Sequence, residues 1–254
     1  MPHVLVTGGA RRIGAEIVRT LAARGWAVTI HCNASVAEGE ALAEALRAAG
    51  GTAHVVTGDL SQADAPRRVV ADAARAGGPL DALVNNASLF LYDTPSAFDP
   101  ATFDLHIAVN LRAPALLSQA FAAQLPEGAA GSVVNLLDNR LYAPNPDYFT
   151  YALGKYGLLG MTEMHALAFA PRIRVNAVAP SIALISGEQS EESFRRAHTN
   201  NPLGRGVTPA DVAAAVAWLL EAPAVTGEVI VVDGGQRLRR RGRDVAFGTE
   251  AAQP

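Results

Sequence analysis

The sequence predicts an α/β protein: a single Rossmann-type, doubly wound domain with about seven parallel strands in one sheet and helices on both faces. Three observations predict this fold. Short apolar runs alternate with longer amphipathic segments along almost the whole chain, as in strands joined by crossover helices. A glycine-rich stretch directly follows the first apolar run. Half of the 254 residues are hydrophobic and only 18% are charged, which allows a sizeable core and argues against disorder.

The predicted strands are short, rich in apolar and β-branched residues, and bounded by turn residues. They are residues 4–6, 27–31, 53–56, 82–84, 132–137, 173–178 and 229–232. Parallel strands joined by right-handed crossovers all end at one edge of the sheet. We therefore expect ligands to bind outside these carboxyl ends.

The predicted helices lie between the strands and show apolar residues at helical spacing or a capping signal. They are the segment from Ile13 to Gly25, Glu40 to Arg47, the segment around Val69 and Val70, Ala101 to Gln124, the segment around Tyr151 and Lys155, Glu191 to His198, and Asp211 to Leu220. Pro114 is expected to kink the fourth of them, because proline lacks the N–H that an α-helix needs.

No shift in composition marks a domain boundary, so residues 1–238 are expected to form one domain. Residues 181–207 are polar and weakly periodic, and a loop of that length in a compact domain is typically a functional lid. We expect this loop to cover the substrate. Residues 239–254 are predicted to be a basic and polar tail, and the short basic run from Arg237 to Arg243 is typical of a solvated end.

The bulk charge and the cysteine count narrow the function classes. A net charge of −3 gives no reason to expect a nucleic-acid partner. The single cysteine, Cys32, excludes an internal disulfide and fits a reducing cytosol. The apolar run at the N-terminus is too short for a signal peptide or a membrane span, so we expect a cytoplasmic protein without a membrane partner. No metal site is predicted.

The stretch from Thr7 to Gly14 is the candidate phosphate-binding loop. Its glycines, Gly8 and Gly14 among them, allow the backbone to approach a pyrophosphate, and the N-terminus of the next helix offers free N–H groups. An ordinary tight turn is the alternative. The position directly after the first strand favours nucleotide binding.

The second strand ends in a way that favours NADPH over NADH. An acidic residue there would bind the 2′-hydroxyl of NAD and repel a 2′-phosphate. This chain instead has His31, Cys32, Asn33, Ala34 and Ser35. Arg12, in the glycine loop, supplies a guanidinium suited to a phosphate. The alternative for His31 is a surface histidine at a strand end.

Polar residues also follow the third and fourth strands, where ligands bind in open α/β sheets. Asp59, followed by Leu60, could accept a hydrogen bond from an adenine amino group. Asn86, Ala87 and Ser88 lie where a dinucleotide would cross the sheet edge. Turn chemistry explains the same residue types and does not exclude contact with a ligand.

Tyr151 and Lys155 lie four residues apart, so a helix places them on one face about one turn apart. A cationic lysine favours the phenolate, so we expect Lys155 to lower the pKa of Tyr151 and to make it a proton donor near neutral pH. This spacing is common on helices and by itself does not indicate catalysis. It indicates a catalytic pair here because a nucleotide-binding pattern accompanies it.

With these motifs, the chain resembles the short-chain dehydrogenase/reductase family from about Val4 to Leu238. The residues that carry the resemblance are Thr7-Gly8 with Gly14, Asp59-Leu60, Asn85-Asn86-Ala87, Asn110, Tyr151 with Lys155, Pro180, and Asp233-Gly234-Gly235. The resemblance implies an NADP-binding reductase domain in which Tyr151 donates a proton. It implies that Lys155 binds the nicotinamide ribose, that Asn110 holds a water linking the lysine to solvent, and that Pro180, Ser181 and Ile182 flank the nicotinamide.

The cofactor-binding residues expected from sequence and resemblance are therefore Gly8, Arg12, Ile13, Gly14, His31, Asn33, Ser35, Asp59, Leu60, Asn86, Ala87, Ser88, Tyr151, Lys155, Pro180, Ser181 and Ile182. The expected catalytic residues are Asn110, Asp138, Tyr151 and Lys155.

Two departures from the family pattern point to the substrate. Arg12 replaces a further glycine, and Asp138 replaces the serine usually found thirteen residues before the tyrosine. An ionised aspartate only accepts hydrogen bonds and would repel a developing oxyanion, which argues against a ketone and for a C=N bond. A turn aspartate in an altered site is the alternative.

Both departures are similar to the pteridine reductase branch, including dihydromonapterin and dihydrofolate reductases. The resemblance implies that Phe90 stacks on a pterin, with Ser88, Asp138 and Tyr151 also contacting it; a hydrophobic wall residue is the alternative for Phe90. We expect NADPH-dependent reduction of a dihydropterin by a homotetramer. The alternatives are a carbonyl reductase of the same family, acting on a 3-oxoacyl group, small ketone or sugar, and a non-catalytic NADPH sensor.

Overall fold

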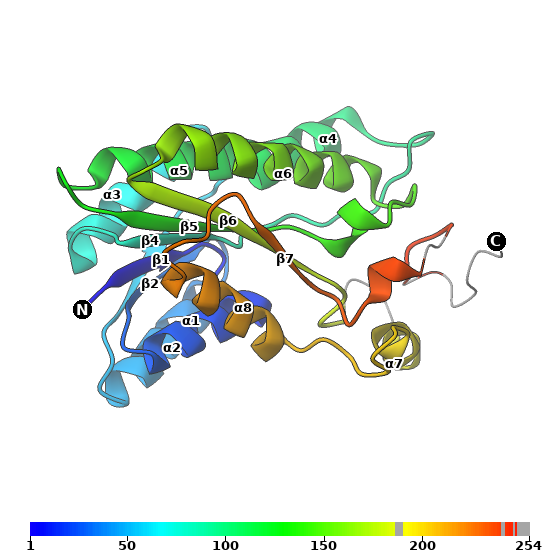
Figure 1. Cartoon of the computed structure of the whole chain (residues 1–254), viewed down its shortest axis with the longest axis horizontal. Helices are drawn as coiled ribbons and strands as arrows, with labels where there is room; N and C mark the ends of the chain where they lie inside the picture. The colour runs from blue at the N-terminus through cyan, green and yellow to red at the C-terminus, as the bar shows by residue number, and fades with distance from the viewer. Residues whose placement is uncertain (186–189, 240–241, 246, 248–254) are drawn as a thin grey trace.

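A parallel β-sheet forms the centre of the protein (Figure 1). The computed structural model describes residues 1–185, 190–239, 242–245 and 247. Over these residues seven strands pair in the order β3-β2-β1-β4-β5-β6-β7. The strands are β1 (His3–Val6), β2 (Ala27–Cys32), β3 (Ala53–Thr57), β4 (Ala82–Asn85), β5 (Gly131–Leu136), β6 (Ile173–Pro180) and β7 (Val229–Val232). The predicted doubly wound parallel sheet is confirmed.

The strand order reverses between β1 and β4. From β1 the chain moves outward through β2 to β3, and it then returns to pair β4 with the other side of β1. The connections on either side of this point diverge, which leaves space for a ligand outside the carboxyl ends of β1 and β4. The register aligns Val6 with Ile30 on one side and with Val84 on the other.

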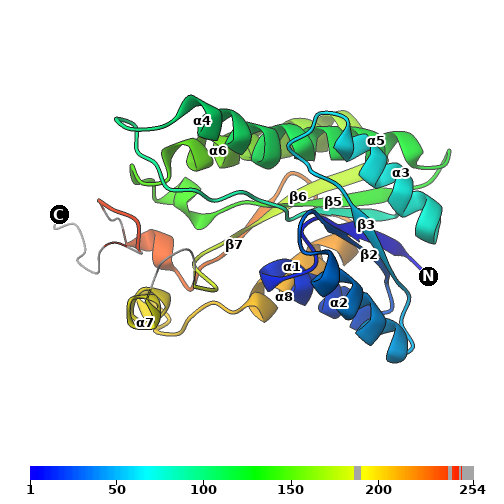
Figure 2. The ribbon, with the colours of Figure 1, turned by 180° about the vertical axis from the view of Figure 1, so that it is seen from behind.

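Helices cover both faces of the sheet (Figures 1 and 2). One layer holds α1 (Arg12–Ala23), α2 (Val36–Ala48) and α8 (Pro209–Glu221). The other holds α3 (Ala65–Gly77), α4 (Pro100–Ile107), α5 (Ala113–Gln124) and α6 (Phe149–Phe169). Helix α7 (Glu191–Thr199) lies away from the sheet, near the short 3₁₀ helix η3 (Gln236–Leu238).

Alternate residues of the central strands supply two separate apolar cores. Val4 and Val6 pack into the cluster under α1 and α8, whereas Leu5 packs into the cluster under α3 and α5. All four residues of β1 are buried, because side chains that alternate across a doubly covered sheet meet a helix layer on either face. The central strands therefore hold the functional loops at their carboxyl ends rigidly.

The long helix predicted from Ala101 to Gln124 contains a π-helical turn, Ala108–Arg112, between α4 and α5. Pro114 lies just after that turn and has no N–H to give to the carbonyl of Asn110, so the regular hydrogen-bond pattern cannot continue through it. The distortion predicted for Pro114 therefore occurs in the preceding turn. That turn contains Asn110, and π-turns are frequent at functional sites.

The polar segment from residue 181 to 207 is partly helical. The predicted helix from Glu191 to His198 is present as α7, with Ser190 capping its N-terminus by accepting a hydrogen bond from Ser193 N. Residues 186–189 of this segment, and residues 240–241, 246 and 248–254 of the predicted tail, lie outside the described residues. Among the helices that the structure describes, none has the length and apolar character required to cross a bilayer.

Candidate active site

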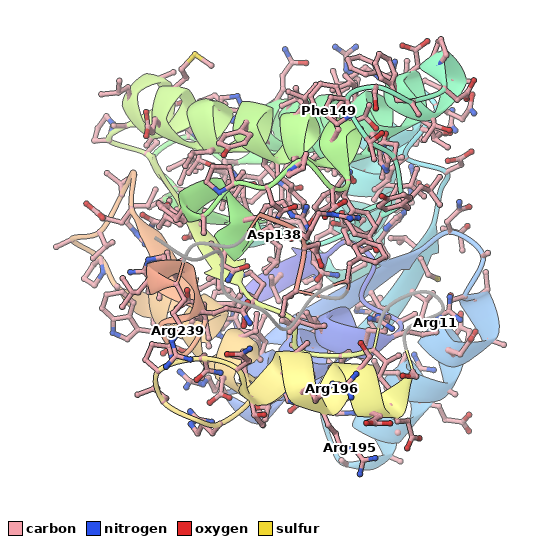
Figure 3. The ribbon with its side chains drawn as sticks, turned by 90° about the vertical axis from the view of Figure 1, so that its right-hand side faces the viewer. Arg11, Asp138, Phe149, Arg195, Arg196 and Arg239 are labelled. Atoms are coloured by element: carbon pink, nitrogen blue, oxygen red, sulfur yellow. The ribbon has the colours of Figure 1, made fainter. Side chains whose placement is uncertain are left out.

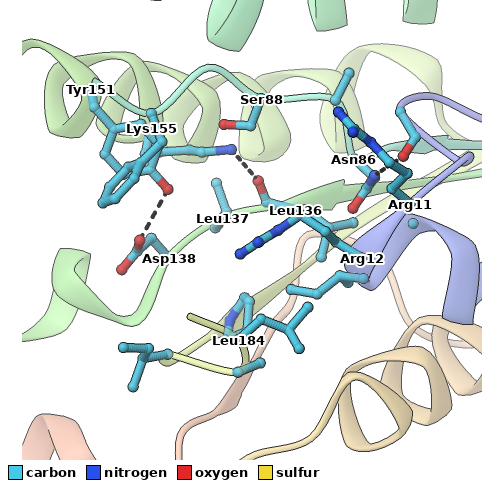
Figure 4. A pocket seen from close by; sticks show the side chains of 18 of the residues that line it. Arg11, Arg12, Asn86, Ser88, Leu136, Leu137, Asp138, Tyr151, Lys155 and Leu184 are labelled. Carbon is cyan, nitrogen blue, oxygen red and sulfur yellow. Dashed lines mark hydrogen bonds between the residues drawn. The ribbon is translucent and has the colours of Figure 1, made fainter. Parts of the chain in front are cut away.

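A cavity of about 550 Å³ runs along the carboxyl edge of the sheet, from the start of α1 to Tyr151 (Figures 3 and 4). That volume suits a small-molecule or cofactor site. Asp138 lies near the middle of this face (Figure 3). The predicted site residues that line the cavity are Gly8, Arg12, Ile13, Gly14, Asn33, Ser35, Asn86, Ala87, Ser88, Phe90, Asp138, Tyr151, Lys155, Pro180, Ser181 and Ile182.

The glycine loop is shaped by two close backbone approaches. Gly8 has a positive φ of 61°, and a Cβ there would lie 3.0 Å from the Cα of Ala87. A Cβ on Gly14 would lie 2.1 Å from the carbonyl oxygen of Gly8. Only glycine fits at these two positions, because any side chain would push the loop away from the strand ends.

Asn86 braces the loop from the neighbouring strand. Its Nδ2 donates hydrogen bonds to the carbonyl oxygens of Thr7 (2.8 Å) and Gly8 (3.1 Å). In return, the backbone N–H groups of Asn86 and Ala87 each donate to Thr7 Oγ1 over 3.0 Å. The residues after β1 and β4 therefore form one rigid unit at the switch point.

Arg12 occupies a backbone conformation that favours glycine. Its φ is 55°, in the left-handed region, which costs a residue with a side chain roughly 1–2 kcal/mol. The guanidinium extends into the cavity (Figure 4). Its Nη2 donates a hydrogen bond to the carbonyl oxygen of Ile185 over 2.9 Å. Arg12 thus links the glycine loop to the segment after β6.

The α1 end of the cavity suits a dinucleotide with a 2′-phosphate. The described residues that line it around Arg11, Arg12, Asn33 and Ser35 include no acidic side chain. The nearest carboxylate in sequence, Glu38, pairs with Arg11 over 3.4 Å at the exposed surface and does not line the cavity. Two guanidinium groups and the α1 N-terminus therefore favour an anion there.

His31 does not line the cavity, and its predicted contact with the cofactor stays a prediction. The ring is buried beneath the glycine loop: Nδ1 accepts a hydrogen bond from the N–H of Gly8 (3.3 Å). Nε2 therefore carries the ring hydrogen and donates to the carbonyl oxygen of Gly58 over 3.0 Å. Burial lowers the pKa of His31, so the neutral ring supports the loop.

Asp59 and Leu60 also lie outside the cavity. The carboxylate of Asp59 is exposed and accepts a hydrogen bond from the backbone N–H of Ser61, a turn contact that lowers its pKa. Leu60 is buried in the core beside Val56 and Val69. Asp59 therefore takes part in a turn and Leu60 in core packing, and their predicted contacts with the cofactor stay predictions.

The opposite end of the cavity contains the residues predicted to transfer the proton. The Tyr151 hydroxyl donates a hydrogen bond to Asp138 Oδ2 over 3.0 Å, and Lys155 Nζ donates to the carbonyl oxygen of Leu136 over 2.7 Å (Figure 4). The Lys155 nitrogen lies 5.6 Å from the centre of the Tyr151 ring. Both side chains come from one face of α6, as the four-residue spacing predicted.

The acid–base properties of this group differ from the prediction. Burial and the neighbouring Asp138 raise the pKa of Tyr151 well above its ordinary value, although we expected Lys155 to lower it. Burial lowers the pKa of Lys155 to about 8, and Asp138 partly opposes this change. The carboxylate disfavours a phenolate beside it, so Tyr151 holds its proton as a hydrogen-bond donor to Asp138.

Asn110 lies behind the cavity wall and positions a loop. Its Oδ1 accepts hydrogen bonds from the N–H of Leu89 (2.8 Å) and from Ser88 Oγ (3.1 Å). Its Nδ2 donates to the carbonyl oxygen of Leu89 over 2.9 Å. Asn110 therefore holds the loop that carries Ser88 and Phe90, and its predicted water-binding role stays a prediction.

Phe90, which was predicted to be at the site, forms an aromatic wall beside Tyr151 with two residues that were not predicted, Tyr148 and Arg140. The Phe90 ring stacks on Tyr148 at 4.0 Å between ring centres and meets Tyr151 edge-on at 4.7 Å. Tyr148 adopts a left-handed φ of 54° at the start of α6. The guanidinium carbon of Arg140 lies 5.3 Å from the Tyr148 ring centre and 5.4 Å from that of Tyr151. In the sequence, the only indication that Arg140 lies at the site is its position two residues after Asp138.

The C-terminal segment, residues 242–245 and 247, forms part of the cavity wall. Asp244 and Val245 line the cavity, and Asp244 pairs with Arg140 across 2.6 Å. Arg243 binds the buried carboxylate of Asp147. Of the described arginines in the basic run, Arg237 pairs with Asp233 and Arg243 with Asp147, whereas the exposed Arg239 donates to Asn200 Oδ1. The solvated tail expected for residues 239–254 stays a prediction.

No group of three or more histidine, cysteine, aspartate or glutamate side chains placed to hold a metal ion occurs in the described part of the chain.

Residues 8–237 match a family model described as enoyl-(acyl carrier protein) reductase. The chain belongs to the short-chain dehydrogenase/reductase family. The cavity of this reductase thus occupies the position at which open α/β sheets bind ligands.

Individual relatives agree with this membership. The crystal structure of FolM alternative dihydrofolate reductase 1 from Brucella canis, complexed with NADP, is 44% identical with a TM-score of 0.88, over 93% of this chain and 94% of that one. An uncharacterized oxidoreductase of Methylorubrum extorquens is 35% identical over 92% of this chain and 96% of its own length. The 3-oxoacyl-[acyl-carrier-protein] reductase FabG of Staphylococcus aureus is 30% identical over 91% of this chain and 96% of its own.

Proposed function

We propose that this short-chain reductase uses NADPH to reduce the C=N bond of a dihydropterin, such as dihydromonapterin or dihydrofolate. The observation that carries the proposal is the hydrogen bond from Tyr151 to the carboxylate of Asp138. A carboxylate in the substrate position accepts N–H groups, which a pterin ring presents, and opposes the oxyanion that forms in ketone reduction. The similarity to a protein described as a dihydrofolate reductase supports the same substrate class.

The enzyme is an NADPH-dependent oxidoreductase, and the fit of the α1 end of the cavity supports this cofactor. Arg12 and the polar residues Asn33 and Ser35 would hold the 2′-phosphate, and the glycine loop would hold the pyrophosphate. Lys155 would hold the nicotinamide ribose, as the family resemblance implies. Bound NADPH supplies the hydride, which adds to the carbon of the substrate C=N bond while the nitrogen takes a proton.

Tyr151 is the proposed donor of that proton. Its raised pKa keeps the hydroxyl protonated until a basic nitrogen approaches. Asp138 orients the hydroxyl and, with 21% of its side chain exposed, can collect a proton from solvent to restore the phenol. The two side chains would then act as one relay from solvent to the substrate nitrogen.

The aromatic wall supports a flat heterocyclic substrate. Phe90, 36% exposed and stacked on Tyr148, lines the cavity beside Tyr151. A planar ring could stack there, and offset stacking contributes about 0.5–1.5 kcal/mol beyond the area buried. The segment from residue 181 to 207 would close over the ring and exclude water, as predicted from its length.

A carbonyl reductase is the second candidate, and one observation favours it. The chain is 30% identical to FabG, which is described as a 3-oxoacyl-[acyl-carrier-protein] reductase and therefore acts on a carbonyl group. A third candidate, an NADPH sensor, would bind the cofactor without turnover and would be indifferent to Tyr151→Phe.

A comparison of substrates tests the proposal. The purified enzyme would receive NADPH with dihydromonapterin, dihydrofolate, a 3-oxoacyl thioester or a small ketone, and the tetrahydropterin product would be identified by chromatography. We expect the highest kcat/KM with a dihydropterin. Turnover of the thioester or ketone alone would overturn the proposal, and NADPH binding with no turnover of any substrate would favour the sensor.

We also propose that the enzyme is a homotetramer that uses the outer surface of α6. This helix exposes Met164 (64%) and Leu167 (83%), and large exposed apolar side chains grouped on one helix are typical of an interface. Light scattering of the wild type and of a Met164→Glu, Leu167→Glu double variant tests this. A monomeric wild type would contradict it.

A further inference from the structure

Two neighbours of Asp138 approach the same one of its oxygens, Oδ2. Oδ1 accepts a hydrogen bond from the backbone N–H of Arg140 over 2.9 Å. Oδ2 accepts the hydroxyl of Tyr151 over 3.0 Å and lies 3.5 Å from Nε of Arg140. At that separation Arg140 Nε is buried and makes no hydrogen bond within the described residues. A buried guanidinium N–H without a partner tends to take the nearest acceptor, which here is the oxygen that Tyr151 uses.

A second carboxylate holds the Arg140 guanidinium in place. Arg140 Nη2 donates to Asp244 Oδ2 over 2.6 Å, and Nη1 donates to the backbone oxygen of Asp147 over 2.9 Å. Arg140 is 7% exposed and Asp244 is 8% exposed, so solvent does little to weaken this pair. Arg140 therefore makes its shorter ion-pair contact with Asp244, at 2.6 Å, and its longer one with Asp138, at 3.5 Å.

Asp244 is itself held by the fold. Its backbone N–H donates to Asp147 Oδ2 over 2.7 Å, and Arg243 Nε donates to the same oxygen over 2.9 Å. The Phe247 ring packs against Tyr92 at 5.1 Å and against Tyr148 at 6.0 Å between centres. Residues on both sides of Asp244 are thus held, Arg243 by Asp147 and Phe247 by Tyr92 and Tyr148. These contacts place the Asp244 carboxylate beside the Arg140 guanidinium.

We propose that Asp244 is a positioning residue of the active site: by pairing with Arg140, it keeps the guanidinium from taking the Asp138 oxygen that binds the Tyr151 hydroxyl. The inference rests on the proposed role of Asp138 and Tyr151 as the proton-transfer pair. Without Asp244, Asp138 is the remaining carboxylate partner of Arg140, so the guanidinium moves closer to Oδ2 and weakens the hydrogen bond that this oxygen accepts from Tyr151. The C-terminal segment is then required for proton transfer although it does not touch the reacting atoms.

The test compares Asp244→Asn with the double variant Asp244→Asn, Arg140→Met in steady-state reduction of dihydrofolate by NADPH. For Asp244→Asn we expect kcat to fall about tenfold or more, a part of the 10²–10⁴-fold that general acid–base catalysis contributes, with little change in the KM for NADPH. The double variant has no guanidinium to compete for Asp138, so its kcat should exceed that of Asp244→Asn. A purely structural role predicts the reverse order.

Two controls keep the test decisive. Glu221→Gln removes an exposed carboxylate paired with Arg24 over 2.8 Å, far from the cavity, and should leave kcat unchanged. A crystal structure of Asp244→Asn should show Arg140 Nε moved onto Asp138 Oδ2. The proposal is overturned if Asp244→Asn retains the wild-type kcat, if the double variant is slower than the single one, or if Arg140 does not move. If the wild type reduces only ketones, the proposed substrate fails, but the crystal structure and the same variants in the ketone assay still decide the role of Asp244.

Discussion

The hydroxyl of Tyr151 donates a hydrogen bond to Asp138 across 3.0 Å, so the tyrosine of this reductase is paired with a carboxylate instead of the usual serine hydroxyl. A serine can donate to a substrate oxygen, whereas an ionised aspartate can only accept. The negative charge also raises the pKa of Tyr151, after the larger effect of burial. In the proposed function we therefore expect the pair to deliver a proton to nitrogen.

Replacement of Tyr151 by phenylalanine removes the proton donor and keeps the ring. We expect kcat for the preferred substrate to fall by about 10²–10⁴-fold, the contribution of a positioned general acid. The dissociation constant for NADPH, measured by fluorescence titration, should change little. An unchanged kcat would mean that Tyr151 does not donate the proton.

Replacement of Asp138 by serine restores the family's hydroxyl. We expect the kcat/KM for dihydropterins to fall and that for a 3-oxoacyl thioester to rise, because the serine can stabilise an oxyanion. The isosteric Asp138→Asn variant is the matched comparison, since it removes the charge and keeps the shape. If Asp138→Ser left pterin reduction intact, the substrate assignment would be lost and the reductase fold would remain.

The pKa of Lys155, lowered to about 8 by burial, predicts a pH dependence. The side chain is charged below that pH and becomes neutral above it. Since the cation holds the cofactor ribose in the proposed role, kcat/KM for NADPH should decline as the pH rises through about 8. Lys155→Arg, which stays charged, should move the decline to a higher pH. A flat profile through this range in the wild type would contradict the assignment.

Arg12→Gly tests cofactor selection. Glycine adopts the left-handed φ of 55° without strain, so the loop should keep its conformation while the guanidinium is lost. A hydrogen bond to a charged group contributes ~1.5–3 kcal/mol, so the preference for NADPH over NADH should fall roughly 10- to 100-fold. The ratio of the two kcat/KM values measures it. Arg24→Gly, at the C-terminal end of the same helix, is the control and should preserve the ratio.

Phe90→Ala tests the aromatic wall. The variant loses the ring that stacks on Tyr148 at 4.0 Å, and we expect the KM for a dihydropterin to rise by roughly 3- to 10-fold. Phe98→Ala is the control, because Phe98 is 44% exposed and does not line the cavity. A rise in KM equal in both variants would show a general loosening of the loop instead of a stacking contact.

The sequence alone determined the sheet, the order of its elements and the position of the site. Alternating patterns define strands and helices locally, and parallel crossover connections bring every strand's carboxyl end to one edge. That is why residues as distant in sequence as Gly8, Asn86 and Lys155 could be assigned to one cavity before their contacts were known. The four-residue spacing of Tyr151 and Lys155 likewise predicted that both side chains lie on one face of a single helix.

Only the tertiary structure decided the environments of these side chains. His31 and Leu60 lie at strand ends, as predicted, but their side chains turn into the core, which a strand-end position does not reveal. The pKa of Tyr151 depends on burial and on Asp138, which outweigh the nearby lysine. Arg140 and Asp244 meet across 104 positions of sequence. Local patterns record which backbone conformation a segment adopts, whereas charge, burial and pairing depend on segments that meet only after folding.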